Sequence, residues 1–222
     1  MSGVQKEIGD LTLDEVARWG SALGRLHLAA RGHPGDDRPS WSDQLPTLPP
    51  DERTAVDLLE RVTDRLACLP AGEDDVGLIH GDFELDNVMW DGGHLSAMDF
   101  DDCGRHWFVA DIAMALRDLR DPDSGQLDPD GPAVGAFLDG YRGERSLPEG
   151  AVEAIPLLLL LHDLTAFGLL LRICDLPVGE PVPDWLSRLD ATLHGMLREY
   201  RDRFATAVVP AAIPDFRAPA AP

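Results

Sequence analysis

Positive charge is scarce in this chain of 222 residues. It has 19 lysine and arginine side chains against 40 aspartates and glutamates, a formal net charge of −21, and Lys6 as its only lysine. Nucleic acids and anionic membranes attract the opposite sign of charge, so we expect neither as a partner. Metal ions and cationic small molecules are favoured, although many acidic proteins carry such charge only as a solvated surface.

Paired cysteines and a targeting segment are also missing. Cys68, Cys103 and Cys174 are widely spaced, odd in number and form no Cys-x-x-Cys pair. This spacing indicates free thiols in a reducing compartment rather than a disulfide framework or a zinc site. The N-terminus lacks the basic and apolar regions of a secretion signal, so we expect a cytoplasmic protein.

An uninterrupted apolar run long enough for a membrane span is absent as well. The most apolar stretch, residues 155–173, contains His162, Asp163 and Arg172. Three ionisable groups would be costly in lipid, so this stretch predicts a buried core helix. The chain length and the 44% hydrophobic content fit one sizeable domain or, at most, two small ones.

Helical patterns dominate most of the chain. Thr12 and Glu15 form a capping-box pattern at the start of a helix expected over residues 12–30. His27 lies on its apolar face and is expected to be a hydrogen-bonded core histidine rather than a metal ligand. Further helices are expected over residues 51–69, 108–119, 133–141, 148–174 and 185–208.

The ends of the chain have a different composition from its middle. Residues 1–10 are short and polar and are expected to be flexible. The Pro- and Ala-rich tail, residues 209–222, is expected to be disordered. One lobe is predicted over residues 11–208.

The chemistry of the chain is concentrated in residues 78–102, LIHGDFELDNVMWDGGHLSAMDFDD. Asp91-Gly92 between two short apolar runs predicts a β-hairpin. Such a hairpin would bring the loop 80–87 and the segment 99–102 to the same end. Carboxylates gathered there repel one another unless a cation lies among them. The sequence therefore predicts a divalent-metal site with a catalytic carboxylate beside it.

The residue types in this stretch suit phosphoryl transfer. Asp82 can accept the proton of a hydroxyl group, which makes that oxygen nucleophilic. Asn87 offers an amide oxygen and Asp99 a carboxylate, a combination that Mg²⁺ accepts. The order His-x-Asp-x4-Asn, followed by Asp-Phe-x, matches a phosphoryl-transfer pattern. A metal-hydrolase site is disfavoured because no second histidine pair lies at a suitable spacing.

The segments HGDFELDNVMW, MDFDD and DIA together resemble the aminoglycoside phosphotransferase and choline kinase-like family, which is related to protein kinases. Residues 22–27 resemble the segment that follows the interlobe hinge in that family. The resemblance implies a mainly α (α+β) fold, namely the C-terminal lobe of the protein-kinase-like fold with a short β-hairpin at the catalytic loop. It also implies Mg²⁺ and ATP or GTP as cofactors and a small-molecule hydroxyl as acceptor. The acidic balance favours an amino sugar or an amino alcohol.

The same resemblance assigns roles to individual residues. Asp82 would be the catalytic base, and His80 would be a structural residue of the same catalytic loop. Asn87 and Asp99 would hold Mg²⁺. Two supporting residues complete the set, namely Asp101, which would assist with metal or substrate, and Asp111, which would brace the loop from the next helix.

The resemblance covers only the C-terminal lobe of the family. A complete member also has an N-terminal lobe with a glycine-rich loop and a strand lysine, whereas Lys6 has no strand here, so we expect that lobe to be absent. Losing one preorganised donor that stabilises charge in the transition state typically lowers the rate about 10²–10³-fold. The isolated chain is therefore expected to have weak phosphotransferase activity or none. Two explanations stay open. The N-terminal lobe is supplied by a second chain or lost by truncation of the gene product, or else the chain is a family member that binds ligands or partners without catalysis. The face near Asp82 and Asp99 should then be open to solvent or covered by a partner chain.

Overall fold

The computed structural model describes residues 3–33, 35, 37–121, 125–148, 150–174 and 184–209. The chain divides into two compact units. Among the described residues, those within 3–43 and 69–159 form unit 1, and those within 44–68 and 160–209 form unit 2. The single lobe predicted over residues 11–208 thus spans both units. The predicted tail, residues 209–222, lies outside the described residues except for Val209.

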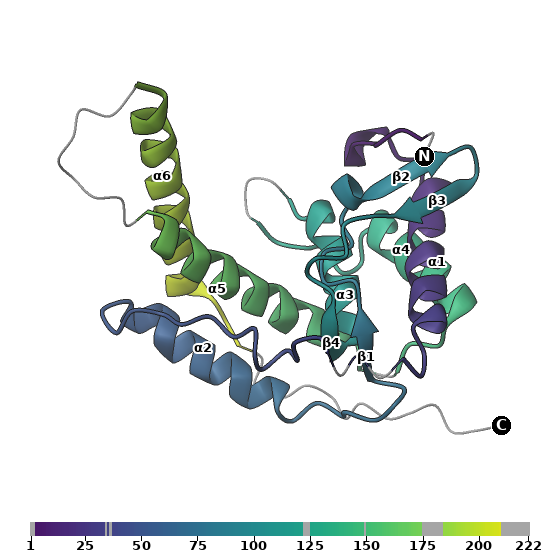
Figure 1. Ribbon diagram of the computed structural model, residues 1–222, viewed down its shortest axis with the longest axis horizontal. Helices are drawn as coiled ribbons and strands as arrows, with labels where there is room; N and C mark the ends of the chain where they lie inside the picture. Colours follow the sequence, from purple (N-terminus) through teal and green to yellow (C-terminus); the bar gives the residue numbers. More distant parts are fainter. Residues whose placement is uncertain are drawn as a thin grey trace. The chain divides into compact units, whose positions relative to one another are not determined.

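Helices predominate in the described residues, in agreement with the predicted mainly α class (Figure 1). The α-helices are α1 (Leu13–Ala29), α2 (Arg53–Leu66), α3 (Phe108–Leu116), α4 (Pro132–Glu144), α5 (Ile155–Ile173) and α6 (Asp184–Thr206). Short 3₁₀ turns are η1 (Ile8–Asp10), η2 (Leu85–Asn87), η3 (Arg117–Leu119) and η4 (Val152–Ala154). Every predicted helix is present, and most of the ends differ by only a few residues.

Helix α1 begins at the predicted capping box. The Thr12 hydroxyl accepts a hydrogen bond from Glu15 N at 3.3 Å, and the Glu15 carboxylate accepts one from Thr12 N at 3.0 Å. Helix α1 packs closely on α4 in unit 1, because glycine removes a side chain at the contact. A Cβ atom added to Gly140 would lie 2.9 Å from Ala17 Cα and closer still to the Ala17 carbonyl.

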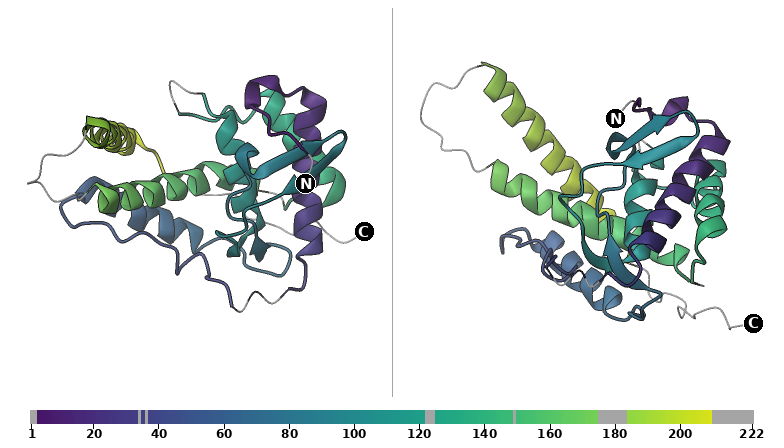
Figure 2. Two further views of the ribbon diagram at one scale, coloured as in Figure 1. Left: turned by 45° about the horizontal axis from the view of Figure 1, so that its top comes forward. Right: turned by 45° about the vertical axis from the view of Figure 1, so that its right-hand side comes forward.

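The predicted hairpin is confirmed and is one of two separate two-stranded sheets in unit 1 (Figure 2). Strand β2 (Val88–Asp91) pairs antiparallel with β3 (His94–Ala97), and Gly92 turns the chain with φ of +60°. A second antiparallel pair, β1 (Val76–Ile79) with β4 (Gly104–Trp107), is present in addition to the predicted hairpin. Strand β4 has no alternating apolar pattern, so its conformation depends on pairing with β1.

The described N-terminal residues contact β2 and α1, while the flexibility of residues 1–10 stays a prediction. Val4 exchanges two backbone hydrogen bonds of 2.9 Å with Trp90 of β2. Lys6 Nζ lies 2.6 Å from a Glu15 carboxylate oxygen and 5.3 Å from the centre of the Trp90 ring. These partners lie far along the chain or on α1, which is why a short polar segment did not reveal them.

Unit 2 is held together by aromatic and charged contacts among its helices. Phe167 of α5 packs against Phe204 of α6, with ring centres 5.3 Å apart. Arg201 of α6 binds the Glu52 carboxylate before α2. By length and composition alone, the stretch Val152–Ile173 could cross a membrane, but 61% of its most apolar 18-residue segment is buried in the structure. That burial agrees with the predicted core helix.

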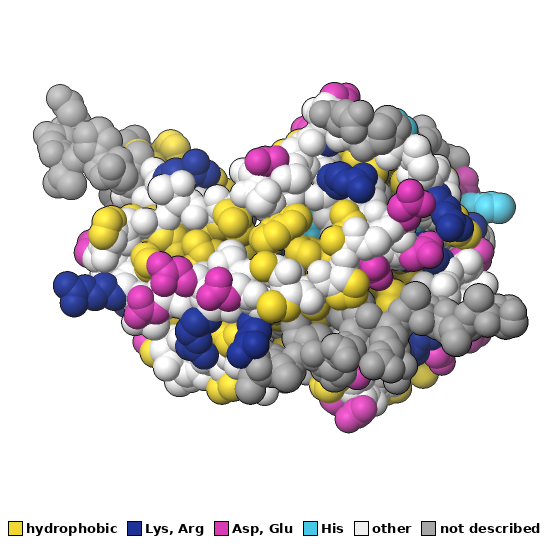
Figure 3. Space-filling view, turned by 90° about the horizontal axis from the view of Figure 1, so that it is seen from below, with side chains coloured by type: hydrophobic (Ala, Val, Ile, Leu, Met, Phe, Trp, Pro, Cys, Tyr) yellow, Lys and Arg dark blue, Asp and Glu magenta, His cyan; other side chains and the backbone are white. Residues whose placement is uncertain are grey.

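The negative charge does not form one continuous patch on the face that Figure 3 shows. Acidic side chains there are interspersed with arginines and hydrophobic side chains. On this face the charge therefore behaves as a solvated surface rather than as a single cation-binding region.

Candidate active site

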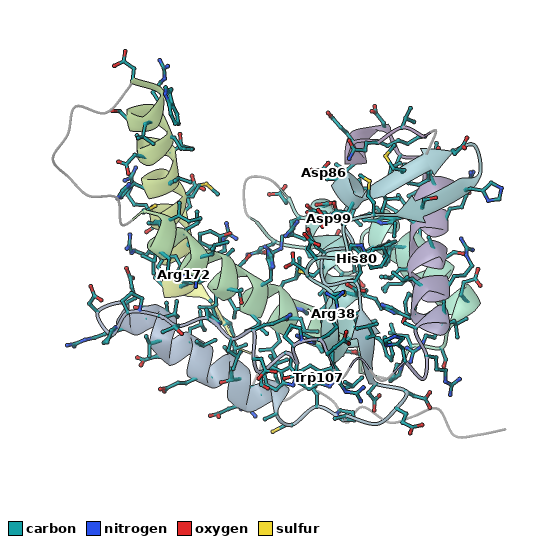
Figure 4. All side chains as sticks on the ribbon, viewed as in Figure 1. Arg38, His80, Asp86, Asp99, Trp107 and Arg172 are labelled. Atoms are coloured by element: carbon teal, nitrogen blue, oxygen red, sulfur yellow. The ribbon has the colours of Figure 1, made fainter. Side chains whose placement is uncertain are left out.

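The β2–β3 hairpin brings the two polar segments of unit 1 together. Met98 N donates to the Asn87 carbonyl at 3.0 Å, one step beyond the last pair of the hairpin. The His80 ring then binds the Met98 carbonyl, also at 3.0 Å. Figure 4 shows His80 and Asp99 between the hairpin and the β1–β4 pair. The loop 80–87 and the segment 99–102 therefore lie at the same end, as predicted.

His80 is a structural link within this site. A carbonyl oxygen can only accept, so His80 Nε2 donates to Met98 O. The backbone N–H of Asp82 donates to His80 Nδ1 at 3.3 Å, so Nδ1 carries no proton. Both ring nitrogens of His80 are thus occupied, and the side chain ties the Asp82 backbone to the segment before Asp99.

Gly81 is required by the close approach of these two segments. Its φ is +88°, a region that L side chains rarely adopt. A Cβ atom there would lie 2.9 Å from the carbonyl carbon of Asp102 and closer to its oxygen. Glycine therefore allows the loop 80–87 to lie directly against the segment 99–102.

Asp82 is a half-buried carboxylate with one oriented oxygen. Asn87 Nδ2 donates to Asp82 Oδ2 and to the Asp82 carbonyl, both at 2.9 Å. Burial raises the pKa of Asp82 above its ordinary value, and Asp102 adds to this rise. Arg117 and the Asn87 hydrogen bond lower the pKa of Asp82 in part. A raised pKa makes the carboxylate a better proton acceptor.

Asn87 and Asp99 have the chemistry of Mg²⁺ ligands. The Asn87 amide nitrogen must face the Asp82 carbonyl, so the amide oxygen points away from Asp82. Asp99 is exposed and has φ of +61°, a backbone conformation in which aspartate is enriched. No group of three His, Cys, Asp or Glu side chains that could hold a metal ion exists among the described residues. An amide oxygen and one carboxylate still suit Mg²⁺, which keeps water or phosphate oxygens as its other ligands.

Asp111 of α3 is fully buried and binds the start of the loop 80–87. Its two carboxylate oxygens accept hydrogen bonds from His80 N and Gly81 N, each at 2.8 Å. The His27 ring donates a third, at 3.0 Å to Oδ2, and its other nitrogen accepts from the Tyr141 hydroxyl at 2.8 Å. Burial lowers the pKa of His27, so its ring stays neutral. His27 is thus a hydrogen-bonded core histidine, as predicted.

Three further residues at this site were not identified from the sequence. Asp118 in η3 accepts a hydrogen bond from Leu85 N at 3.1 Å, and Arg117 beside it binds the Glu84 carboxylate. Asp118 follows Asp111 by seven residues, which is two helical turns. That spacing was the available signal: one side of α3 and η3 presents carboxylates to both ends of the loop.

The segment after β3 is open to solvent in unit 1. Asp99, Phe100, Asp101 and Asp102 are all exposed. The described residues of the chain therefore do not bury this part of the site, in line with the predicted open face. The catalytic and metal-binding roles of the individual residues stay predictions.

Comparisons with known proteins agree with this geometry. Residues 1–149 match the model of the phosphotransferase enzyme family. Amicoumacin kinase of Bacillus subtilis (strain 168) is 28% identical over 182 residues, which cover 76% of this chain and 54% of that protein. Homoserine kinase of Pseudomonas aeruginosa (strain LESB58) is 33% identical over 147 residues, 61% of this chain and 44% of that protein. The chain thus spans about half the length of these curated relatives.

Solved structures share the fold. The complex of amicoumacin kinase hAmiN with AMP-PNP, Ca²⁺ and Ami has a TM-score of 0.76 at 25% identity, over 95% of this chain and 64% of that one. The microcompartment-associated aminopropanol kinase has a TM-score of 0.61 at 22% identity, over 93% and 67% of the two chains. Since the family model matches well over half of the chain and these kinases share its fold, the chain belongs to the phosphotransferase enzyme family.

Proposed function

We propose that this chain activates a small-molecule hydroxyl group for transfer of the γ-phosphate of a nucleotide. The observation that carries the proposal is the geometry of Asp82. Its Oδ2 is held by Asn87 at 2.9 Å, and its loop is held by the two backbone bonds to Asp111. The other oxygen, Oδ1, then takes the proton of the acceptor hydroxyl as the oxygen attacks phosphorus.

The metal half of the proposed site consists of Asn87 and Asp99, with Asp101 in support. Mg²⁺ bound there would neutralise charge on the β- and γ-phosphates of ATP or GTP. The outward-facing Asn87 amide oxygen and the exposed Asp99 carboxylate support this assignment. His80 contributes by holding the segment that carries Asp99 in position against the loop.

The acceptor is proposed to carry an amino group. The names of two relatives, homoserine kinase and aminopropanol kinase, refer to small amino-bearing alcohols. In this chain Asp82, Glu84 and Asp102 lie near one another, and Arg117 is beside the first two of these three carboxylates. Such an environment favours an ammonium group on the acceptor over an anionic one.

Activity of the isolated chain is expected to be slow. Lys6, the only lysine, is committed to Glu15 and to the Trp90 ring. The chain therefore has no lysine to orient the nucleotide phosphates. A preorganised donor of this kind is worth about 10²–10³ in rate. Further residues supplied by another chain, or by a longer form of this one, would raise the rate.

Turnover measurements test the base. ADP formation from Mg·ATP is followed with homoserine, aminopropanol or amicoumacin as acceptor, in the wild type, Asp82→Ala and Asp86→Ala. Asp86 is the matched control because its side chain is exposed in the same loop. Removing a general base typically costs 10²–10⁴ in rate, so Asp82→Ala should lose at least about 100-fold while Asp86→Ala stays near the wild type. Equal rates in all three proteins would refute the assignment.

Binding measurements test the metal half and the non-catalytic alternative. Calorimetric titration with Mg·AMP-PNP should show at least about tenfold weaker binding for Asp99→Asn than for the wild type. Unchanged affinity would count against Asp99 as a ligand. If the wild type binds amino alcohols but shows no Asp82-dependent turnover, the chain acts as a binding or partner subunit instead.

A further inference from the structure

We propose that Arg117 is a further catalytic residue, whose guanidinium group contacts the phosphoryl group as it passes to the acceptor. The inference rests on the proposed function, because it takes Asp82 as the base. Arg117 Nη2 lies 3.9 Å from Asp82 Oδ1. That is the carboxylate oxygen which Asn87 leaves free, since Asn87 binds Oδ2. The cation and the proton-accepting oxygen therefore face the same point.

The distance between Arg117 and Asp82 indicates a role for Arg117 beyond a salt bridge with the proposed base. A charged hydrogen bond spans about 2.7–2.9 Å, so the 3.9 Å ion pair between Arg117 and Asp82 contains no hydrogen bond between the two side chains. An acceptor hydroxyl must come within about 2.6–3.2 Å of Oδ1 to lose its proton. An acceptor hydroxyl bound to Oδ1, and the phosphorus atom that the hydroxyl oxygen attacks, would then lie within reach of the guanidinium group.

Arg117 is held in this place from two sides. Glu84 binds its Nη2 directly, and the two side chains are only 25% and 20% exposed. Asp118, the next residue, accepts the Leu85 N–H at 3.1 Å and so anchors the backbone of η3 to the catalytic loop. The long arginine side chain is thus ordered before any substrate arrives, which saves the entropy of ordering it during the reaction.

The charge of the surroundings explains why a cation is needed at this position. Asp82, Glu84 and Asp102 lie close together, and the transferred group is itself an anion. Without a positive charge beside Oδ1, these carboxylates would repel the incoming phosphoryl oxygens. A guanidinium group stabilises the charge on those oxygens, as arginines do in other phosphoryl-transfer sites.

The test compares Arg117→Ala and Arg117→Lys with Arg25→Ala in the turnover assay above, using the acceptor on which the wild type is active, or water if it uses none. Arg25 is the matched control because its pair with Glu144 is on the surface of the same unit. Arg117→Ala should lower kcat about 10²–10³-fold with KM changed less than about threefold, and Arg117→Lys should recover part of kcat. Added ethylguanidinium should raise the rate of Arg117→Ala at least about tenfold and leave that of Arg25→Ala unchanged.

The outcomes separate this inference from the proposed function. Wild-type turnover that depends on Asp82, with Arg117→Ala as active as Arg25→Ala, overturns the role of Arg117 alone. Loss of activity together with loss of amide-exchange protection at Leu85, and without rescue by ethylguanidinium, means that Arg117 only holds the loop, and this also overturns the inference. A wild type without Asp82-dependent turnover overturns the proposed function and the inference with it.

Discussion

Replacing Asp111 by asparagine removes a charge on which three donors depend. His80 N and His27 Nε2 share Oδ2, and Gly81 N binds Oδ1. An asparagine has only one acceptor oxygen, so whichever way its amide turns, at least the Gly81 N–H or the His80 N–H faces an NH₂ group. Asp111, His80 and His27 are each at most 1% exposed, so water has little access to the residue 111 side chain.

The cost follows from these contacts. One buried N–H left without an acceptor costs about 1–3 kcal/mol. The remaining hydrogen bonds also weaken, because a bond to a charged acceptor is roughly twice as strong as one to a neutral acceptor. We expect Asp111→Asn to lower the free energy of unfolding by about 3–5 kcal/mol. That is a large share of the 5–15 kcal/mol typical of a folded domain.

Two measurements check the expected loss. Urea unfolding followed by tryptophan fluorescence gives the change in free energy, with Asp86→Asn as an exposed control expected to stay within about 0.5 kcal/mol. Hydrogen exchange should show lower protection of the His80 and Gly81 amides in Asp111→Asn. If Asp111→Asn unfolds at the urea concentration of Asp86→Asn with both amides still protected, the assignment of Asp111 as the anchor of the loop is wrong.

Two further predictions concern stability. Gly140→Ala should destabilise the protein by about 2 kcal/mol or more in urea unfolding, because the new methyl group overlaps the Ala17 backbone. Gly135→Ala in the same helix meets open space and should stabilise the protein by about 0.5–1 kcal/mol. Similar changes in unfolding free energy for both variants would contradict the close contact of α1 with α4. Burial lowers the pKa of His106 from 6.5 to about 4, and Trp107 N donates to its Nδ1 at 2.8 Å, so the folded state disfavours the protonated ring. The unfolded chain binds this proton first, so its contribution of roughly 3 kcal/mol is present above pH 6.5 and is lost as the pH falls to 4. His106→Gln should flatten the dependence of unfolding free energy on pH in this window relative to the exposed control His94→Gln.

Much of the fold was predictable where the deciding contacts lie within a few residues. The capping box joins Thr12 to Glu15, three positions apart, and the hairpin turns at Asp91-Gly92. The same locality explains the success with the family, because the His-x-Asp-x4-Asn order is contained in one loop. Strand β4 could not be predicted in this way, since Gly104 to Trp107 are extended only by pairing with Val76 to Ile79.

In the candidate site, too, local features were predictable from the sequence and long-range contacts were not. Asp82, Asn87 and Asp99 were predicted as site residues from the sequence by itself, because all three lie close to one hairpin in a single short stretch. Only the tertiary structure decided what holds them. Asp111 reaches His80 across 31 positions of the chain and His27 across 84, and Arg117 arrives beside Asp82 from the end of α3. Contacts over such separations depend on how helices pack, and a single sequence contains no local pattern for them.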